Sequence, residues 1–231
     1  MTSADQSPHR SGAGRLMAGA AAAAFLCGSW LLHEGATTSS PPQPDRAAAA
    51  DAAGTLAPSA PSAPGSPAAS ASHTTTGPAL PPSPPVRLRI PAIRVDARVT
   101  GLGLDSHGEL TTPPTGQHDL TGWYREGTAP GAFGTAVIIG HVDDQKGPSV
   151  FYLLGKLHPG QTLTVTRQDN RTAVFTVDAV RTFPKAGFPS HSVYDATGRA
   201  ELRLVTCGGH YDHRNGYQAN TVVFAHLTGS K

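Results

Sequence analysis

Residues 202–209 read Leu-Arg-Leu-Val-Thr-Cys-Gly-Gly, a short apolar strand pattern that runs into a cysteine and two glycines. The Leu and Val residues favour an extended strand, and the glycine pair favours a sharp turn after it. The sequence therefore predicts that Cys207 lies at the end of a strand, where a reactant can approach its thiol. The only other cysteine of the 231 residues, Cys27, lies in a separate apolar run, so no disulfide within the same domain is expected. A lone cysteine in a folded domain is a candidate reactive thiol, and a buried inert thiol is the plain alternative.

A second strand pattern ends in a histidine. Residues 136–139 read Ala-Val-Ile-Ile and are followed by Gly140 and His141. A thiol nucleophile needs a base or an imidazolium partner to form its thiolate, and a donor to stabilise the oxyanion formed on attack. Two strands that deliver His141 and Cys207 from their ends are the arrangement that a catalytic dyad on a barrel needs. A single histidine is more often a structural residue, so the hypothesis of a catalytic dyad rests on the two strand patterns together.

The same thiol allows one other chemistry. Cys207, His210 and His213 stand close in sequence and could bind zinc, with His141 or Asp143 as a further ligand. The histidines of this polar loop are also compatible with plain solvation. The sequence has no acidic calcium loop of the D-x-D-x-D-G type. We expect the protein to use no cofactor and no metal.

Elsewhere in the chain, short β-branched or alternating runs recur between clusters of Gly, Pro, Asp and Asn, and no window has a long helical apolar period. Many short strands separated by turns are typical of a mainly β fold, a small closed or half-closed barrel. A short helix is expected at 150–154 and a further turn near 193–197. The expected strands lie at 87–90, 93–99, 136–140, 163–167, 173–183, 201–206 and 221–226.

The N-terminal region predicts a membrane anchor. Residues 16–32 form an apolar run of 17 residues, preceded by Arg10 and Arg15. A membrane-spanning helix needs roughly 17–25 such residues, and a signal-peptide core roughly 7–15. The positive charges on its N-terminal side predict that residues 1–15 stay in the cytoplasm and that the rest of the chain is exported. A cleaved secretory signal is the alternative, and it gives the same destination.

Between the anchor and the aromatic-rich part of the chain lies an expected linker. Residues 33–85 hold 12 of the 21 prolines and no Phe, Tyr or Trp, and Pro, Ala and Ser fill 34 of these 53 positions. So little bulky apolar surface does not offset the entropy of ordering the chain, which predicts a disordered tether. Residues 86–231 hold 12 of the 14 aromatic residues, and they form the expected folded domain.

The charge of the chain excludes one large class of function. It has 18 Lys and Arg against 16 Asp and Glu, a formal net charge of +2, and no basic block. Binding to nucleic acid is driven mainly by basic residues that release counterions, so no nucleic-acid partner is expected. With 21 prolines, 26 glycines and only 15% charged residues, a long helical bundle or coiled coil is also disfavoured.

Several segments of the sequence together resemble the sortases, cysteine transpeptidases of the Gram-positive cell surface, and most closely the actinobacterial class F group. The resemblance covers nearly all of 86–231 and implies an eight-stranded sortase β-barrel behind a membrane tether. The matching stretches are RIPAIRVDARV, GLGLDSHGELTTPP, TGWYREGTAPGAFGTAVIIGHVDD, GPSVFYLLGKLHPGQTLTV, FPKAGFPSHSVY, LRLVTCGGHYD and NTVVFA.

The resemblance also implies roles for single residues. The GH motif of the family places the catalytic histidine at His141, and the TLxTC motif places the nucleophile at Cys207, with Arg203 in the position of its first Thr. The catalytic arginine of better-known sortases corresponds to about Asn220. Arg214 is the nearest arginine in the intervening loop, and we assign the role to it, with Arg203 as the weaker candidate.

Further residues are expected to bind substrate. Thr206 and Gly208, which flank the nucleophile, are assigned to substrate binding. The segment 111–114 and the aromatic residues Trp123 and Tyr124 are possible groove or lid contributors, although aromatic residues near a strand more often belong to the core.

The function implied by the resemblance is transfer of a secreted protein to the cell wall. The enzyme would cleave a C-terminal LPxTG-like sorting signal, hold the protein as a thioacyl intermediate and pass it to the amine of a peptidoglycan precursor. We expect a monomer in the cell membrane with an extracellular catalytic domain. The non-enzyme alternative is a membrane-tethered extracellular β-barrel binding module. Another wall enzyme, an L,D-transpeptidase, would need S-x-G-C-x-R, which this chain lacks.

Overall fold

The computed structural model describes residues 40–45 and 77–231. The expected membrane segment at 16–32 and most of the expected linker lie outside these ranges. Within the described ranges, no helix combines the length and the apolar character needed to cross a membrane.

The end of the expected linker is part of the folded unit. The backbone N–H of Gly77 donates to the carbonyl of Leu227, and that of Leu80 donates to the carbonyl of Gly131, both at 2.8 Å. The Leu80 side chain is buried among core residues. These contacts show that ordered structure begins before Val86, where the aromatic-rich sequence starts.

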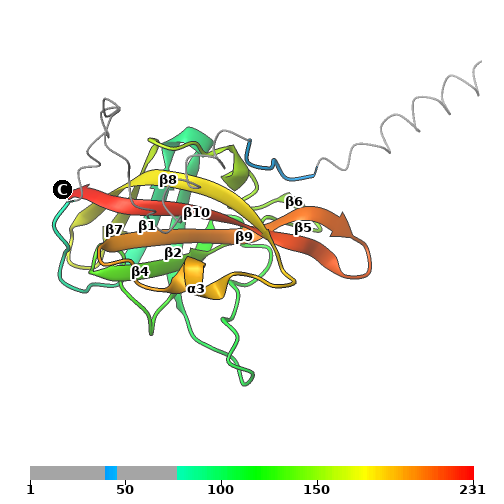
Figure 1. Ribbon diagram of the computed structural model, residues 1–231, viewed down its shortest axis with the longest axis horizontal. Helices are drawn as coiled ribbons and strands as arrows, with labels where there is room; N and C mark the ends of the chain where they lie inside the picture. The colour runs from blue at the N-terminus through cyan, green and yellow to red at the C-terminus, as the bar shows by residue number, and fades with distance from the viewer. Residues whose placement is uncertain (1–39, 46–76) are drawn as a thin grey trace, which may run out of the picture. The chain divides into compact units, whose positions relative to one another are not determined.

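Eight strands close into one barrel, in the order β1-β2-β3-β4-β9-β10-β8-β7, which confirms the expected mainly β, eight-stranded fold (Figure 1). A two-stranded sheet, β5 (Asp143–Asp144) with β6 (Gly147–Pro148), stands outside it. The barrel strands are β1 (Pro85–Ile90), β2 (Val95–Leu102), β3 (Leu120–Tyr124), β4 (Gly134–Ile139), β7 (Thr162–Arg167), β8 (Thr172–Pro184), β9 (Ala200–Asp212) and β10 (Gly216–Ser230).

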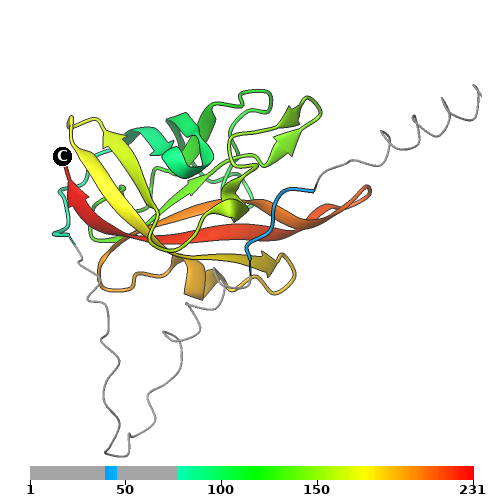
Figure 2. The same ribbon diagram turned by 90° about the horizontal axis from the view of Figure 1, so that it is seen from above.

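The strand directions bring several C-terminal ends to one end of the barrel. β4 pairs with β9 in parallel, whereas β9 and β8 each pair antiparallel with β10. β4, β8 and β9 therefore point the same way. β9 and β10 form a long hairpin that projects from the barrel at this end, as the two views in Figures 1 and 2 show. The candidate catalytic residues lie at the base of this hairpin.

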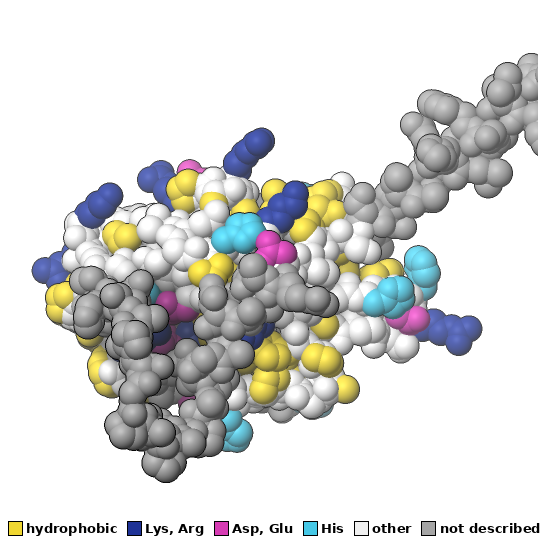
Figure 3. Space-filling view, turned by 45° about the horizontal axis from the view of Figure 1, so that its top comes forward, with side chains coloured by type: hydrophobic (Ala, Val, Ile, Leu, Met, Phe, Trp, Pro, Cys, Tyr) yellow, Lys and Arg dark blue, Asp and Glu magenta, His cyan; other side chains and the backbone are white. Residues whose placement is uncertain are grey.

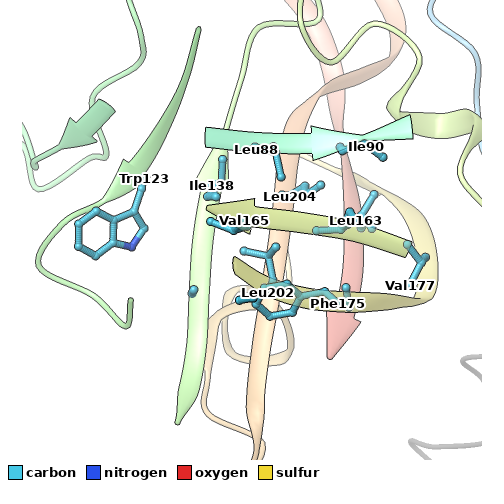
Figure 4. Close-up of a cluster of buried hydrophobic side chains, with 14 of the residues drawn as sticks. Leu88, Ile90, Trp123, Ile138, Leu163, Val165, Phe175, Val177, Leu202 and Leu204 are labelled. Carbon is cyan, nitrogen blue, oxygen red and sulfur yellow. The ribbon is translucent and has the colours of Figure 1, made fainter. Parts of the chain in front are cut away.

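Alternation of side chains fills the barrel. Successive residues of a strand point to opposite faces, so every second apolar residue enters the interior. Figure 4 shows these side chains converging between the strands, whereas Trp123 lies to one side. The completely buried members include Leu88, Ile90, Ile138, Leu163, Val165, Phe175, Leu202 and Leu204.

Leu204 offers a test of this core. It is completely buried two residues before Thr206 on β9, so we expect Leu204→Ala to lower the free energy of unfolding by about 2–5 kcal/mol through lost apolar burial and the cavity left behind. Urea unfolding followed by circular dichroism measures the change. Leu104→Ala is the matched control because Leu104 is 45% exposed, and its effect should stay within about 0.5 kcal/mol. Equal effects of the two substitutions would contradict the packing described here.

The strand β3 was not expected from the sequence. Its five residues, Leu-Thr-Gly-Trp-Tyr, include a glycine that weakens the strand pattern. The structure explains Gly122: a Cβ there would lie 2.0 Å from Cδ1 of Leu102, which packs across it from β2. The residue that hides β3 in the sequence is therefore the one that lets β2 and β3 pack side by side.

Helical structure is sparse and differs in detail from the expectation. The segment 150–154, expected as a helix, forms turns, and the 3-10 helix η3 (Leu154–Lys156) begins only at its last residue. A second 3-10 turn, η2 (Pro91–Ile93), precedes β2. It ends at Arg94, whose φ of 56° delays the strand to Val95. The helix α3 (Ser190–Tyr194) lies in the β8–β9 connection, slightly before the expected turn.

Candidate active site

The parallel pair β4–β9 carries His141 and Cys207 to the same edge of the barrel. The register of this pair ends with Ile139 opposite Val205. The two strands stay in contact one residue further, because the N–H of Gly140 donates to the carbonyl of Val205 at 3.2 Å. β4 ends at Ile139 and β9 continues beyond Val205, so His141 and Cys207 each follow this last pair by two residues and lie at the same edge of the barrel. The structure thus places the two residues predicted as a dyad at one edge of the barrel, and their action as a pair stays a prediction.

Cys207 does not end its strand. The expectation that it does is wrong, because β9 continues through it to Asp212 by pairing with β10. The sharp local geometry lies two residues later, at Gly209, whose φ of 76° is in the left-handed region. The pairing with β10 also shifts register between Tyr217 and Ala219. Cys207 is half-buried, is not in a disulfide, and shares the outer face of β9 with Val205.

His141 is held by the segment 111–114. Its Nε2 lies 2.7 Å from the carbonyl oxygen of Pro113, which can only accept a hydrogen bond. Nε2 therefore carries a proton, and Nδ1 is the ring nitrogen left to exchange one. The backbone is fixed as well, since the N–H of Phe151 donates to the carbonyl of His141 at 3.0 Å. Such a hold on one ring nitrogen is how an imidazole is oriented for proton transfer.

Thr206 and Gly208 have packing roles next to Cys207. The hydroxyl of Thr206 donates to the carbonyl of Gly140 at 2.8 Å, which ties β9 to the end of β4. A Cβ at Gly208 would lie 2.4 Å from Oγ1 of Thr221, so only glycine fits there. Both residues support the junction that carries His141 and Cys207, and their predicted part in substrate binding stays a prediction.

Arg214 lies in the turn of the β9–β10 hairpin. The last paired residues are Asp212 and Gly216, and Oδ1 of Asp212 accepts the backbone N–H of Arg214 at 2.9 Å. β9 continues for five residues from Cys207 to Asp212, about 16 Å at about 3.3 Å per residue, before the turn that holds Arg214. Figure 3 shows histidine, acidic and basic side chains gathered at the end of the molecule where this hairpin projects. The structure does not bring Arg214 to the His141–Cys207 pair, and its catalytic role stays a prediction.

The weaker arginine candidate, Arg203, is occupied elsewhere. Its guanidinium is buried, forms an ion pair with Glu201 at 2.5 Å, and donates to the carbonyl of Val193 in α3 at 2.9 Å. Burial lowers the pKa of Arg203 despite the neighbouring carboxylate. Arg203 thus fastens α3 to the outer face of the barrel.

An apolar strip leads along that outer face to the candidate dyad. It joins outward residues of β4, β8, β9 and β10 with residues of the β8–β9 connection, and α3 covers part of it. Edge contacts between aromatic rings, such as Phe183 with Phe188 at 5.9 Å between centroids, line this strip. Its members are Val137, Ile139, Phe183, Phe188, Val193, Val205, Val222 and Phe224.

One contact at the site was not foreseen. The hydroxyl of Tyr217 on β10 donates to the carboxylate of Asp143, two residues after His141. Burial, together with this hydrogen bond and the charge of Asp143, raises the pKa of Tyr217, and the nearby Cys207 contributes in the same direction. The bond therefore ties the segment that follows His141 to the hairpin that carries Cys207. The only sequence signal was the acidic residue in the Gly-His-Val-Asp phrase.

Removing this tie should have a measurable cost. We expect Tyr217→Phe to lower the free energy of unfolding by about 1 kcal/mol, because the carboxylate of Asp143 loses a donor at a half-buried place. Urea unfolding at neutral pH measures it. Tyr211→Phe is the matched control on the same hairpin, since Tyr211 is exposed and makes ring contacts but no side-chain hydrogen bond within the described part of the chain. An equal change in both variants would contradict a specific role for the Tyr217 hydroxyl.

The structure also places the candidate zinc ligands and the candidate groove residue Trp123. Among residues 40–45 and 77–231, no three His, Cys, Asp or Glu side chains lie together in a way that could hold a metal ion. His213 instead lies against Tyr211, at 5.5 Å between ring centroids. Trp123 belongs to the core, and its indole N–H donates to the carbonyl of Thr128 at 2.9 Å.

A free thiol and an oriented imidazole at one edge of a closed β-barrel, with an apolar strip leading to that edge, fit a cysteine acyl-transfer enzyme. The family model of the sortase domain matches residues 88–228, most of the folded part and more than half of the chain. The chain therefore belongs to the sortase family. It is an enzyme, a cysteine transpeptidase.

Solved structures similar to this chain are also sortases. Sortase A from Listeria monocytogenes is 19% identical, with a TM-score of 0.48 over 63% of this chain and 87% of that one. Sortase C-1 from Actinomyces oris is 20% identical, with a TM-score of 0.47 over 62% and 74%. Sortase A from Corynebacterium diphtheriae is 17% identical, with a TM-score of 0.48 over 63% and 61%. A comparison with curated protein sequences found no match.

Proposed function

We propose that this chain is a class F sortase that cleaves a sorting signal in secreted proteins and joins them to the amine of a cell-wall precursor. The observation that carries the proposal is the parallel β4–β9 pair, which delivers His141 and Cys207 to one edge of the barrel. The nucleophile and the acid–base group of an acyl transfer must meet at the same carbonyl. A histidine held through one ring nitrogen suits that task.

The proposed reaction has two halves. The thiolate of Cys207 adds to the carbonyl carbon of the scissile peptide bond, and the π electron pair of the C=O bond moves to the oxygen. When the C–N bond breaks, the departing amine takes a proton from the His141 imidazolium, and a thioester to Cys207 remains. An incoming amine then adds to the thioester, gives a proton to His141, and expels the thiolate. Water in place of the amine gives slow hydrolysis.

The proposed substrate is an extended peptide with apolar residues, of the LPxTG type. The partly exposed members of the apolar strip, such as Ile139 and Phe224, support this, because an extended peptide could bury its apolar side chains against them. The fixed position of α3, which Arg203 holds through the carbonyl of Val193, gives the strip a wall.

The proposed location is the outer side of the cell membrane. The apolar run at 16–32, with Arg10 and Arg15 before it, supports an N-terminal anchor, and the Pro, Ala and Ser content of 33–85 supports a spacer. A monomer on such a tether would reach both the secreted protein and the precursor amine.

One experiment tests the reaction, the nucleophile and the substrate class together. The full chain is incubated with Leu-Pro-X-Thr-Gly pentapeptides and hydroxylamine as the amine, and intact mass spectrometry follows the adduct on Cys207. We expect glycine to be released as the thioacyl adduct forms on Cys207, and the adduct to be consumed as the hydroxamate appears. Cys207→Ala supplies the control. Binding of the peptides without cleavage, although Cys207 is alkylated by iodoacetamide, would favour the binding-module alternative.

A further inference from the structure

Asn220 is the direct neighbour of the candidate nucleophile. The register of β9 and β10 places Asn220 opposite Cys207, with Gly208 opposite Ala219 and Thr206 opposite Thr221 on either side. Residues directly opposite in an antiparallel pair point to the same face, with Cβ atoms about 4.5–5.5 Å apart. The Asn220 side chain therefore stands beside the thiol on the outer face of the barrel.

The amide of Asn220 is free to act on a substrate. Asn220 is half-buried, and its side chain makes no hydrogen bond within the part of the chain that the structure describes. An amide offers two N–H donors, which normally find acceptors when they are removed from water. On the side away from Cys207, the register places Phe183 of β8 next to Asn220. The donors thus lie in a partly apolar setting that strengthens a hydrogen bond to an anion.

The two arginines on the same face of β8 and β9 are directed elsewhere. Arg181 and Arg203 both lie against the ring of Phe224, at 5.9 and 4.6 Å from its centroid. Phe224 lies four residues beyond Asn220 on β10, away from the row that contains Cys207. Arg203 is further held by Glu201, and Arg214 lies in the hairpin turn.

We propose that Asn220 is a catalytic residue that donates its Nδ2–H to the oxyanion formed when Cys207 attacks the substrate. This inference rests on the proposed acyl transfer. As the sulfur adds to the carbonyl carbon, the oxygen takes the π electron pair and gains negative charge, which the amide stabilises without transferring a proton. When the C–N bond breaks, the carbonyl re-forms and the hydrogen bond weakens. An amide donor that acts in the transition state raises kcat.

The test compares acyl transfer with alkylation of the same thiol. The full chain and its Asn220→Ala variant are assayed for hydroxamate formation from the best Leu-Pro-X-Thr-Gly peptide and for the rate of iodoacetamide labelling of Cys207. Loss of one side-chain oxyanion donor costs about 10²–10³ in kcat. We expect a loss of that size in transfer, whereas labelling, which forms no oxyanion, should change less than about threefold.

Two further variants sharpen the result. Asn220→Asp keeps the size of the side chain and removes its N–H donors, so it should lose transfer at least as strongly as Asn220→Ala. Asn215→Ala, the matched asparagine in the turn of the same hairpin, should keep both rates. Thermal unfolding checks that each variant is folded.

Distinct outcomes would overturn the proposal. Transfer within about threefold of the original chain in folded Asn220→Ala would remove the role, and a large loss in Arg214→Ala would then move it to Arg214. Equal losses of transfer and labelling in both Asn220 variants would show that the residue acts on the thiol itself. If the unaltered chain forms no thioacyl adduct, the proposed function fails, which is a different result from failure at Asn220.

Discussion

Cys207→Ala is expected to reduce peptide transfer by at least about 10⁴-fold, because no thioester can form without the thiol. The full chain is incubated with a Leu-Pro-X-Thr-Gly peptide and hydroxylamine, and the hydroxamate is quantified over a time long enough to detect very slow turnover. The thioacyl adduct seen by intact mass should disappear in the same variant. Peptide binding should persist, since the apolar strip formed by Val205, Phe224 and their neighbours is untouched.

The chain supplies its own control for this substitution. Cys27 is the only other cysteine, and it lies in the N-terminal apolar run. Cys27→Ala should keep transfer and keep the adduct. The half-buried place of Cys207 on the outer face of β9 makes its truncation mild for folding, so thermal unfolding should change little. Full transfer activity in folded Cys207→Ala would remove the cysteine mechanism altogether.

The barrel could be predicted where local pattern and burial agree. Leu202 and Leu204 alternate with outward residues on β9, and Phe175 and Val177 do so on β8, which is the period that marks a strand. β3 was not predicted because Gly122 interrupts the alternating pattern, although the strand needs that glycine to pack on Leu102. Local pattern reveals a strand only when its own residues supply the signal.

The hairpin beyond Cys207 shows the same limit. His210, Tyr211 and Asp212 have no apolar alternation, and they are extended because β10 pairs with them. The strand-end position expected for Cys207 was wrong for this reason. The Arg214 assignment relied on distance along the chain, and extended pairing carries that residue to the far turn of the hairpin.

The residue pairs of the site depend on contacts between distant segments. Tyr217 donates a hydrogen bond to Asp143, 74 residues away in sequence, and no local pattern predicts such a bond. A role for Asn220 beside Cys207 could be inferred only from the register of β9 and β10, which places the two residues opposite each other. The placement of His141 and Cys207 at one edge could be predicted because each follows a strongly apolar run, and the two runs pair in parallel.

His141→Ala is expected to be the second large effect, a loss of about 10³-fold in transfer from a peptide, within the range of about 10²–10⁴ for general acid–base catalysis. The amine that leaves a peptide bond must be protonated, and Nδ1 of His141 is the nitrogen left free once Nε2 donates to Pro113. The assay is hydroxamate formation from the same pentapeptide. His210→Ala, an exposed histidine beyond Cys207 on β9, should keep its activity.

A second substrate separates the acid role of His141 from a structural one. A thioester with the same acyl peptide loses a thiolate, which departs without prior protonation, so the proton from His141 matters less to acylation. We therefore expect His141→Ala to acylate Cys207 from the thioester much faster than from the peptide, and to regain at least about tenfold of the lost rate. An imidazole that only shaped the site would give equal losses on both substrates. That outcome, in a variant that unfolds at the original temperature, would leave the hydrogen bond to Pro113 as a structural contact and would assign the proton transfer to another group.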